Sequence, residues 1–284
     1  MIDFHDAFVA ACFDESEARF KGEVASDDVR LRAIQKVLSP LEGRRILDLG
    51  CGKGRFAAHL KAAGAEVVGV DLSSEMLAHA IGLDRVRASA RCLPFAGKTF
   101  DAVVAIEVLE HVGDVGPVLR EARRVLRPGG RIAIIDKNAR ALNARRPWLP
   151  SLLVKWIDER RGLWMYPSGS PVRERWFVPK VLKDQLSREF EEARVEFLLR
   201  PEEARRAVFR LVPVARLMTL WTARVPGSST DVLTSPRRDG GATLPPAPRA
   251  TGRNHGCQSA RTEAGSNGSC NPREGSRGEV EGRR

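Results

Sequence analysis

A glycine-rich loop between two apolar segments most constrains how this chain can fold. Residues 46–54 read Ile-Leu-Asp-Leu-Gly-Cys-Gly-Lys-Gly, a helix-compatible stretch follows at 55–63, and a second apolar segment, 66–70, leads to Asp71. Glycine lets the chain turn sharply and lets a ligand lie against backbone amides, and a helix start adds unpaired N–H groups. An acid after the next strand can hold ribose hydroxyls. The pattern predicts a nucleoside-binding unit at the edge of a parallel sheet.

The spacing of the glycines indicates which nucleoside. In the dinucleotide fingerprint G-x-G-x-x-G the last glycine allows close helix–strand packing beside a pyrophosphate, but here Arg55 stands at that position. Asp48 precedes the loop, and its negative charge disfavours phosphate and suits an ammonium group. The loop therefore favours a ligand with a ribose, an amino group and no phosphate over NAD. A glycine-rich turn without a ligand is the alternative.

With these features, residues 46–137 resemble the class I S-adenosylmethionine-dependent methyltransferases, in the branch that acts on small molecules. The motifs that carry the resemblance are Leu-Asp-Leu-Gly-Cys-Gly at 47–52, Val-Asp-Leu-Ser-Ser-Glu-Met-Leu at 70–77, Leu-Pro-Phe at 93–95, Phe-Asp at 100–101, Glu-Val-Leu-Glu-His-Val at 107–112 and Val-Leu-Arg-Pro-Gly-Gly at 125–130. The resemblance implies an S-adenosyl-L-methionine cofactor, whose methionine part the glycine loop holds and whose ribose diol Asp71 takes. The cofactor residues that it implies are Asp48, Gly50, Cys51, Gly52, Gly54, Asp71, Leu72, Met76, Ser89, Ala90 and Glu107.

The chain departs from its relatives in the segment that lies against the adenine. Many relatives carry an aspartate four residues before the leucine of Leu-Pro-Phe, where this chain has Ser89. We therefore expect the contact with the adenine amino group to be weaker, or to come from the backbone of Ala90.

Strand-like and helix-like segments alternate along the chain. Strands are expected at 46–49, 66–70, 101–106, 131–135 and 194–199, and helices from the cap signal at 26–28 onward, at 55–63, at 119–126 before the stop Pro128-Gly129-Gly130, and at 181–190. This alternation predicts an α/β protein with an open, doubly wound, Rossmann-like and mostly parallel sheet, with helices on both faces. Its ligands would bind at the carboxyl ends of the strands.

Two regions break the alternation. Residues 137–178 form a long, tryptophan-rich stretch between strand and helix, which predicts a helical lid insertion. Residues 236–284 contain no Phe, Trp, Tyr or Ile and are rich in Gly, Pro, Ser and Arg, so they cannot bury enough apolar surface to fold. The sequence thus predicts one methyltransferase domain over 1–235 and a disordered tail over 236–284.

Composition predicts a cytoplasmic enzyme. The five cysteines (12, 51, 92, 257 and 270) are odd in number and form no C-x-x-C pair, which argues against a disulfide framework or a zinc site. No run of 18 apolar residues is present. The first twenty residues are acidic, unlike the basic start of a signal peptide.

The positive charge lies in one part of the chain. Residues 1–139 carry 20 basic and 20 acidic side chains, whereas 140–225 carry 18 and 10, a net charge of +8. This second segment is either a solvated basic face or a cap that receives an anionic or lipid-linked acceptor by peripheral contact with the inner face of an anionic membrane. Residues 207–225 fit an interfacial helix with Trp221 at the surface, and also a buried helix. The tail arginines alternate with acids and lack aromatic partners, which speaks against nucleic acid.

The candidate catalytic residue is His111. A sulfonium is an activated methyl donor, so positioning and water exclusion supply most of the acceleration, and a base matters for a poorly acidic hydroxyl or an ammonium. Glu107, Glu110 and His111 would share one face of a helix. A similar Glu-x-x-Glu-His run in ubiquinone-biosynthesis O-methyltransferases implies a divalent metal in some members. A purely structural or helix-capping role of this run is also open, and we assign no metal ligand.

The sequence thus predicts an S-adenosylmethionine-dependent methyltransferase that acts on a small molecule, with a hydroxyl as the favoured acceptor. The alternatives are an RNA or protein methyltransferase and a nucleoside-binding module without activity. Neither the acceptor nor an oligomeric state is predicted.

Overall fold

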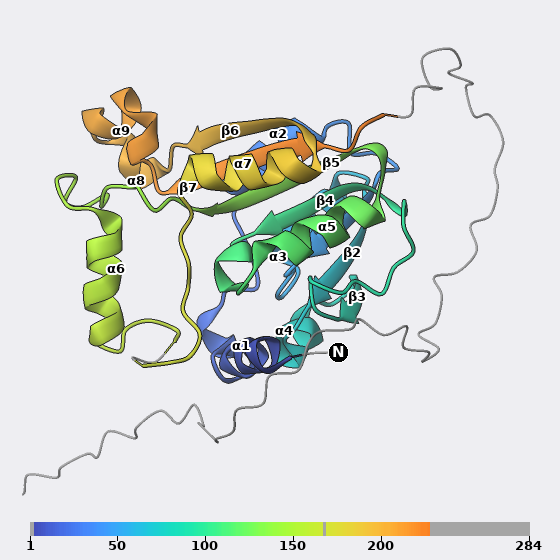
Figure 1. Ribbon diagram of the computed structural model, residues 1–284, viewed down its shortest axis with the longest axis horizontal. Helices are drawn as coiled ribbons and strands as arrows, with labels where there is room; N and C mark the ends of the chain where they lie inside the picture. The colour runs from blue at the N-terminus through green and yellow to red at the C-terminus, as the bar shows by residue number, and fades with distance from the viewer. Residues whose placement is uncertain (1–2, 167–168, 228–284) are drawn as a thin grey trace, which may run out of the picture.

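The computed structural model describes residues 3–166 and 169–227. Their core is a seven-stranded sheet in the order β3-β2-β1-β4-β5-β7-β6 (Figure 1). The strands are β1 (Arg45–Leu49), β2 (Glu66–Asp71), β3 (Asp84–Arg87), β4 (Phe100–Ile106), β5 (Leu126–Lys137), β6 (Glu191–Leu198) and β7 (Met218–Arg224). Strands β1 to β5 are parallel, and β7 runs antiparallel to both β5 and β6. The predicted Rossmann-like, mostly parallel sheet is confirmed.

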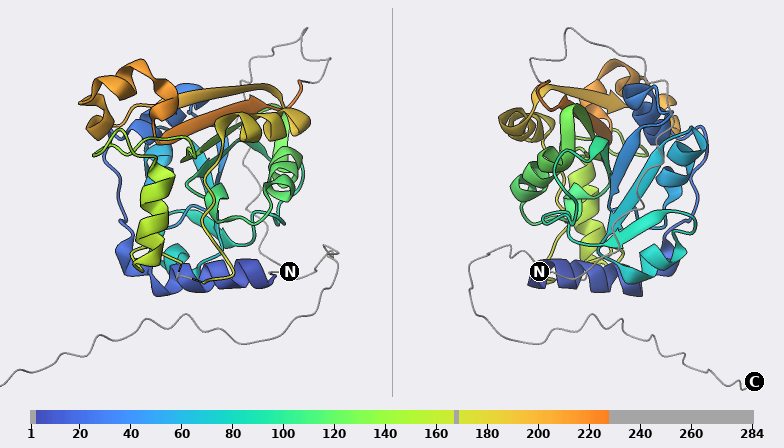
Figure 2. Two further views of the ribbon diagram at one scale, coloured as in Figure 1. Left: turned by 60° about the vertical axis from the view of Figure 1, so that its left-hand side comes forward. Right: turned by 90° about the vertical axis from the view of Figure 1, so that its right-hand side faces the viewer.

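Helices cover both faces of the sheet (Figure 2). The helices are α1 (Phe4–Glu15), α2 (Val29–Leu38), α3 (Arg55–Ala62), α4 (Ser74–His79), α5 (Val115–Val125), α6 (Ser151–Arg160), α7 (Pro179–Glu189), α8 (Pro201–Ala204) and α9 (Ala207–Leu211), with 3₁₀ turns η1 (Glu17–Arg19), η2 (Leu109–His111) and η3 (Pro213–Ala215). Helices α2 and α3 pack on one face through residues such as Leu31 and Phe56. Helices α5 and α7 pack on the other through Leu119 and Leu182.

The start of α2 follows from its sequence. The Asp28 carboxylate accepts the Arg30 N–H at 2.8 Å, as expected of an N-cap residue. Leu31, Ile34 and Leu38 recur at helical spacing and are all buried against the sheet. The helix predicted to follow the cap signal at 26–28 is confirmed.

The segment 207–225 is not a single helix. It contains α9, the turn η3 and strand β7, and Trp221 is fully buried, with its Nε1 donating to the Pro179 carbonyl at 2.9 Å. A strand buried on both faces is apolar at nearly every position, so periodicity does not separate it from a buried helix. The interpretation of 207–225 as an interfacial helix with Trp221 at the surface is therefore wrong.

The stop signal Pro128-Gly129-Gly130 also has a different role from the predicted one. Helix α5 ends at Val125, and β5 begins at the next residue, Leu126. The Pro-Gly-Gly run lies where the register between β4 and β5 jumps from Phe100↔Leu126 to Ala102↔Arg131. A Cβ at position 130 would lie 2.8 Å from the Arg127 carbonyl oxygen, so glycine is required there. The run makes a bulge at the start of a strand and does not end the helix.

Two segments far apart in sequence meet beyond the carboxyl ends of the strands. Val9 and Cys12 of α1 form a small apolar cluster with Tyr166 and Val172, which follow α6 in the chain. The expected lid insertion, 137–178, thus contains α6. The expected tail over 236–284 and the domain end at 235 lie outside the described residues. Within the described ranges, no helix is long and apolar enough to cross a membrane.

Candidate functional site

A cavity of about 430 Å³ opens at the carboxyl ends of the parallel strands. Its walls come from the glycine loop after β1, the end of β2, residues 88–91 after β3 and residues 106–112 after β4. Side chains of α1 and of residues 163–165 close the other sides. This volume is in the range of small-molecule and cofactor sites.

Eleven of the twelve predicted site residues line this cavity. They are Asp48, Gly50, Cys51, Gly52, Asp71, Leu72, Met76, Ser89, Ala90, Glu107 and His111. Gly54 is not in the cavity wall. It stands at the N-cap of α3 with φ +77°, and a Cβ there would lie 3.4 Å from Ala80 Cβ. Its role is the turn into the helix and close packing below the loop.

The glycine loop has the backbone shape that a nucleoside ligand needs. Gly50 has φ +64°, and a Cβ at this position would overlap the Val108 side chain. Gly52 has φ +53°, and apart from its chain neighbours no atom of the described residues lies within 4 Å of the position of its Cβ. Gly52 therefore leaves open space in the cavity wall, and the residues fit a ligand that lies against the loop.

Asp71 is fixed by two backbone amides. Its Oδ2 accepts the Gly52 N–H at 2.8 Å and its Oδ1 accepts the Ser73 N–H at 2.9 Å. Each carboxylate oxygen can accept a second hydrogen bond, so the side chain remains available to ribose hydroxyls. Burial raises the pKa of Asp71, and the hydrogen bonds from Ser73 and Gly52 oppose that rise.

Asp48 is the second acid of the cofactor end. It is buried at the end of β1, and its burial, together with the charge of Asp71, raises its pKa to about 7. A buried carboxylate with this pKa gains from a positive ligand group, because a cation nearby favours the ionised form. The prediction that the site suits an ammonium group has this electrostatic basis.

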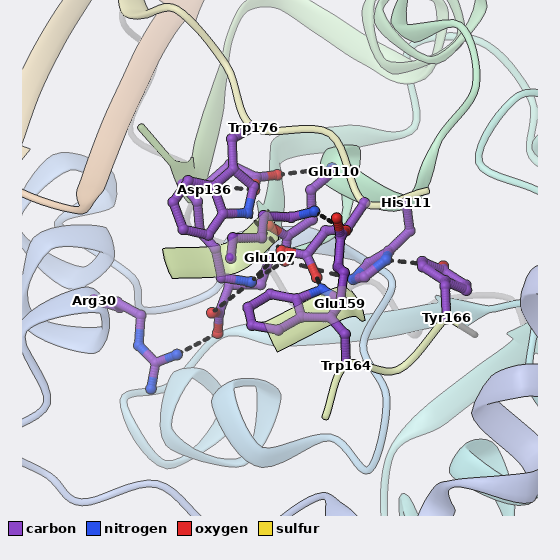
Figure 3. A network of polar contacts seen from close by, with 12 residues as sticks. Arg30, Glu107, Glu110, His111, Asp136, Glu159, Trp164, Tyr166 and Trp176 are labelled. Atoms are coloured by element: carbon purple, nitrogen blue, oxygen red, sulfur yellow. Dashed lines mark hydrogen bonds and ion pairs between the residues drawn. The ribbon is translucent and has the colours of Figure 1, made fainter. Parts of the chain in front are cut away.

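The run 107–111 is not a helix, contrary to the expected shared face. Glu107 has φ +57°, and only Leu109–His111 form a 3₁₀ turn. Glu107 turns toward α2 and α3, where it pairs with Arg30 and, at 3.4 Å, with Arg55. Glu110 is buried and pairs with Lys137 at 2.6 Å (Figure 3). The two acids therefore do not share a helical face, although Glu107 Oε1 also lies 3.9 Å from Lys137 Nζ.

His111 lines the same cavity as Asp71 and is held by side chains of other segments. Its Nδ1 is 2.9 Å from the Tyr166 hydroxyl, and its Nε2 is 3.5 Å from Glu110 Oε1 (Figure 3). The Phe13 ring of α1 packs edge-on against the imidazole, with 5.1 Å between the ring centroids. Three segments of the chain therefore fix the position of this side chain.

The residues around His111 do not fit a divalent metal. Ligand atoms of Glu110, His111 and Glu174 lie within 4.8 Å of one another, with Glu174 in place of the expected Glu107. However, Lys137 Nζ lies 2.6 Å from Glu110 Oε1 and 3.1 Å from Glu174 Oε1, where it already supplies the positive charge. Although burial disfavours the ammonium, the charges of Glu110, Glu174 and Glu107 raise the pKa of Lys137.

Several cavity residues were not predicted from the sequence. Asp6 and Phe13 come from α1, Lys137 from the end of β5, and Trp164 and Glu174 from the lid segment. They belong to no motif, and their side chains meet only through tertiary packing. The tryptophan-rich composition of 137–178 was the one signal that pointed to part of this group.

Known proteins match the same region. The family described as "Methyltransferase domain" matches residues 47–134. A ubiquinone biosynthesis O-methyltransferase from Bordetella avium (strain 197N) is 33% identical over 184 residues, which cover 61% of this chain and 73% of that protein. Methyltransferase GfsG from Streptomyces halstedii is 43% identical over 107 residues, 33% of this chain and 38% of that protein. The crystal structure of an S-adenosylmethionine-dependent methyltransferase from Mesorhizobium loti shares the fold, with a TM-score of 0.53 and 24% identity over 70% of this chain and 98% of that one.

The chain therefore belongs to the class I S-adenosylmethionine-dependent methyltransferases. It is an enzyme whose methyl donor is S-adenosyl-L-methionine and whose acceptor is a small molecule, as predicted.

Proposed function

We propose that the enzyme methylates the hydroxyl group of an aromatic small molecule. The observation that carries the proposal is a single cavity that contains the cofactor residues, His111 and a set of apolar side chains. These side chains are Phe13, Phe20, Leu163, Trp164 and Met165. Aromatic and sulfur-containing side chains favour a flat aromatic ligand. The relatives named O-methyltransferases of ubiquinone biosynthesis support oxygen as the methylated atom.

Three features of the cavity would hold S-adenosylmethionine. Asp71, which is held by the Gly52 N–H, would accept hydrogen bonds from the ribose hydroxyls. Asp48 would pair with the amino group, and the open position at Gly52 would let the ligand lie on the loop. S-adenosylmethionine supplies an activated methyl group on a sulfonium when it is bound. The protein's task is to hold the acceptor oxygen in line and to exclude water.

His111 takes the acceptor's proton in this proposal. We place the imidazole proton on Nδ1, which lies 2.9 Å from the Tyr166 hydroxyl, so that Nε2 is the basic atom. Burial raises the pKa of Tyr166, so its hydroxyl stays neutral. Although burial opposes ionisation, hydrogen bonds and charges from His111 and Lys137 lower the pKa of Glu110. The ionised Glu110, 3.5 Å from Nε2, then stabilises the imidazolium.

The test is a methyl-transfer assay with radiolabelled S-adenosylmethionine and a panel of phenols and catechols. His111→Gln should lower kcat by about 10²–10⁴-fold, the usual contribution of a general base, and leave cofactor affinity unchanged. His79→Gln is the matched control, because His79 is exposed and lies outside the cavity. Unchanged kcat in His111→Gln, or labelling of RNA or protein in place of the phenols, would contradict the proposal.

We also propose that the acceptor site opens beside an anionic membrane surface. Exposed side chains occur along α6 and in the segments on either side of it, and together they are here called the α6 surface: Trp148, Leu152, Leu153, Trp156 and Leu163 with Arg145, Arg146, Arg160 and Arg161. Trp148 and Trp156 are 73% and 47% exposed. Leu163 also lines the cavity. A lipid-linked acceptor would thus pass from the membrane into the cavity along this surface.

Vesicle sedimentation tests the membrane contact. The enzyme should sediment with phosphatidylglycerol vesicles at low salt and be released at high salt, because salt screens the arginines. A Trp148→Ser, Trp156→Ser double variant should remain in the supernatant. Leu211→Ser is the control, since Leu211 is an exposed apolar residue of α9 outside the α6 surface. Equal sedimentation of wild type and double variant would show that the α6 surface is not the contact.

A further inference from the structure

Asp6, in the first turn of α1, is a buried carboxylate in the cavity wall. Only 5% of the residue is exposed, and it lines the same cavity as Ser89 and Asp71. Its Oδ1 lies 2.7 Å from Arg91 Nη2. Its Oδ2 is buried and has no hydrogen-bond partner among the described residues. Buried polar atoms are nearly always paired, so this oxygen indicates a donor that a ligand brings.

The charge state of Asp6 defines what that donor must be. Burial alone would raise its pKa, but His5, Ser89 and Arg91, which lie beside the carboxylate, outweigh burial and lower the pKa to about 2. At neutral pH the side chain is therefore an anion that accepts hydrogen bonds and donates none. A ligand group that faces Oδ2 must carry an N–H or O–H.

The position of Asp6 relative to the strands indicates which part of the ligand carries this donor. In the proposed function Asp71, at the end of β2, takes the ribose. The neighbouring strand β3 pairs Arg87 with Asp71 and leads directly into Ser89 and Ala90. The base attached to the ribose would then extend toward Ser89, beside which Asp6 lies. Adenine has one exocyclic donor, its 6-amino group.

We propose that Asp6 Oδ2 accepts a hydrogen bond from the 6-amino group of the cofactor's adenine, so that α1 supplies the carboxylate that position 89 lacks. The N-terminal helix is then part of the nucleoside site and makes the site favour adenine over other bases. The inference rests on the proposed placement of the ribose at Asp71. The competing explanation is that Asp6 only holds Arg91 in place.

Two ligands that differ at one position separate these explanations. S-adenosylhomocysteine presents a 6-amino group, and S-inosylhomocysteine presents a carbonyl oxygen that would face the carboxylate. By calorimetry the wild type should bind the adenosyl compound at least about 100-fold more tightly, because a site built for a donor rejects an acceptor. In Asp6→Asn the amide can turn its oxygen toward the 6-amino group of one ligand or its NH₂ toward the carbonyl oxygen of the other, and the ratio should fall to about tenfold or less. Because the ratio is internal to each variant, a general loss of affinity cancels.

Asp3→Asn is the matched control. Asp3 also pairs with Arg91, at 2.6 Å, but its side chain is 46% exposed and lies outside the cavity. Its ratio should equal that of the wild type, whereas a fall in both variants would show that Arg91 alone matters. A wild type that binds both ligands equally, or an Asp6→Asn ratio equal to the wild type's, overturns the role of Asp6. A folded wild type that binds neither ligand overturns the proposed cofactor site itself.

Discussion

The two ends of the cavity are built in different ways. At the cofactor end, the ligand-facing groups come from the ends of β1, β2 and β4 within residues 48–107, and backbone dihedrals and amides fix them. At the acceptor end, Phe13 of α1, Lys137, residues 163–165 and Glu174 come together from three distant parts of the chain. There the positions depend on ion pairs and ring contacts between side chains. The cofactor end should therefore tolerate substitutions away from its glycines. The acceptor end depends on each side chain of its network.

Removal of Lys137 should break the acceptor end most severely. Lys137→Met leaves Glu110 and Glu174 buried without their shared cation, and removal of one partner from a buried pair costs about 3–5 kcal/mol. Denaturant unfolding measures this loss. Lys180→Met is the control, because the exposed Lys180–Asp184 pair should be worth at most about 1 kcal/mol. Similar losses in the two variants would show that the network does not support the fold.

Filling the glycine loop should break the cofactor end. Gly52→Val puts a branched side chain into the open space of the cavity wall, at φ +53°, and should lower S-adenosylhomocysteine affinity by more than about 100-fold. Gly82→Val is the matched control, since Gly82 has φ +73°, no atom within 4 Å of its Cβ position and no place in the cavity. It carries the same backbone strain and should retain affinity. Calorimetry that finds wild-type affinity in Gly52→Val would remove the loop from the site.

Removal of a single carboxylate at the cofactor end should have a smaller effect. Asp71→Ala deletes one acceptor for the ribose and should weaken cofactor binding by about 10- to 150-fold, the range of a charged hydrogen bond of about 1.5–3 kcal/mol. S-adenosylhomocysteine titration in the calorimeter measures it. A ligand that lacks the 2′-hydroxyl should then bind Asp71→Ala almost as tightly as S-adenosylhomocysteine does. If this ligand loses as much affinity in the variant as it loses in the wild type, the ribose lies elsewhere.

The smallest expected effect is a pH dependence of stability and cofactor affinity that arises from Asp48. Its pKa of about 7 exceeds the ordinary 3.8, so the folded enzyme binds more protons here than the unfolded chain. This group therefore lowers stability as pH rises from about 4 to 7. Binding of an ammonium group favours the ionised form, so cofactor affinity should rise about tenfold from pH 6 to pH 8, with release of a proton. Calorimetry in two buffers of different ionisation enthalpy counts that proton, and Asp48→Asn should release none.

The same contrast explains what the sequence could predict. Asp48, Gly52 and Asp71 were found because glycine dihedrals and strand-end acids leave a local pattern at fixed spacing. Glu107 was found to line the cavity, but its direction was misjudged, since the run 107–111 is not helical. Asp6, Lys137 and Glu174 could not be predicted, because only the tertiary fold brings them together. Strand β7 was mistaken for a helix because it is buried on both faces.

The position of β7 orders the assembly of the molecule during synthesis. Although it is the last strand in the described part of the chain, β7 lies between β5 and β6 in the sheet (Figure 1). A nascent chain that ends before Met218 has an open edge on β5, while β6 has been made and has no strand to pair with. Unpaired edges are templates for association with other chains, so premature termination in this region should yield aggregation-prone protein. The cofactor end, built from β1, β2 and β4, can be complete before the strand that steadies Lys137 at the end of β5 has left the ribosome.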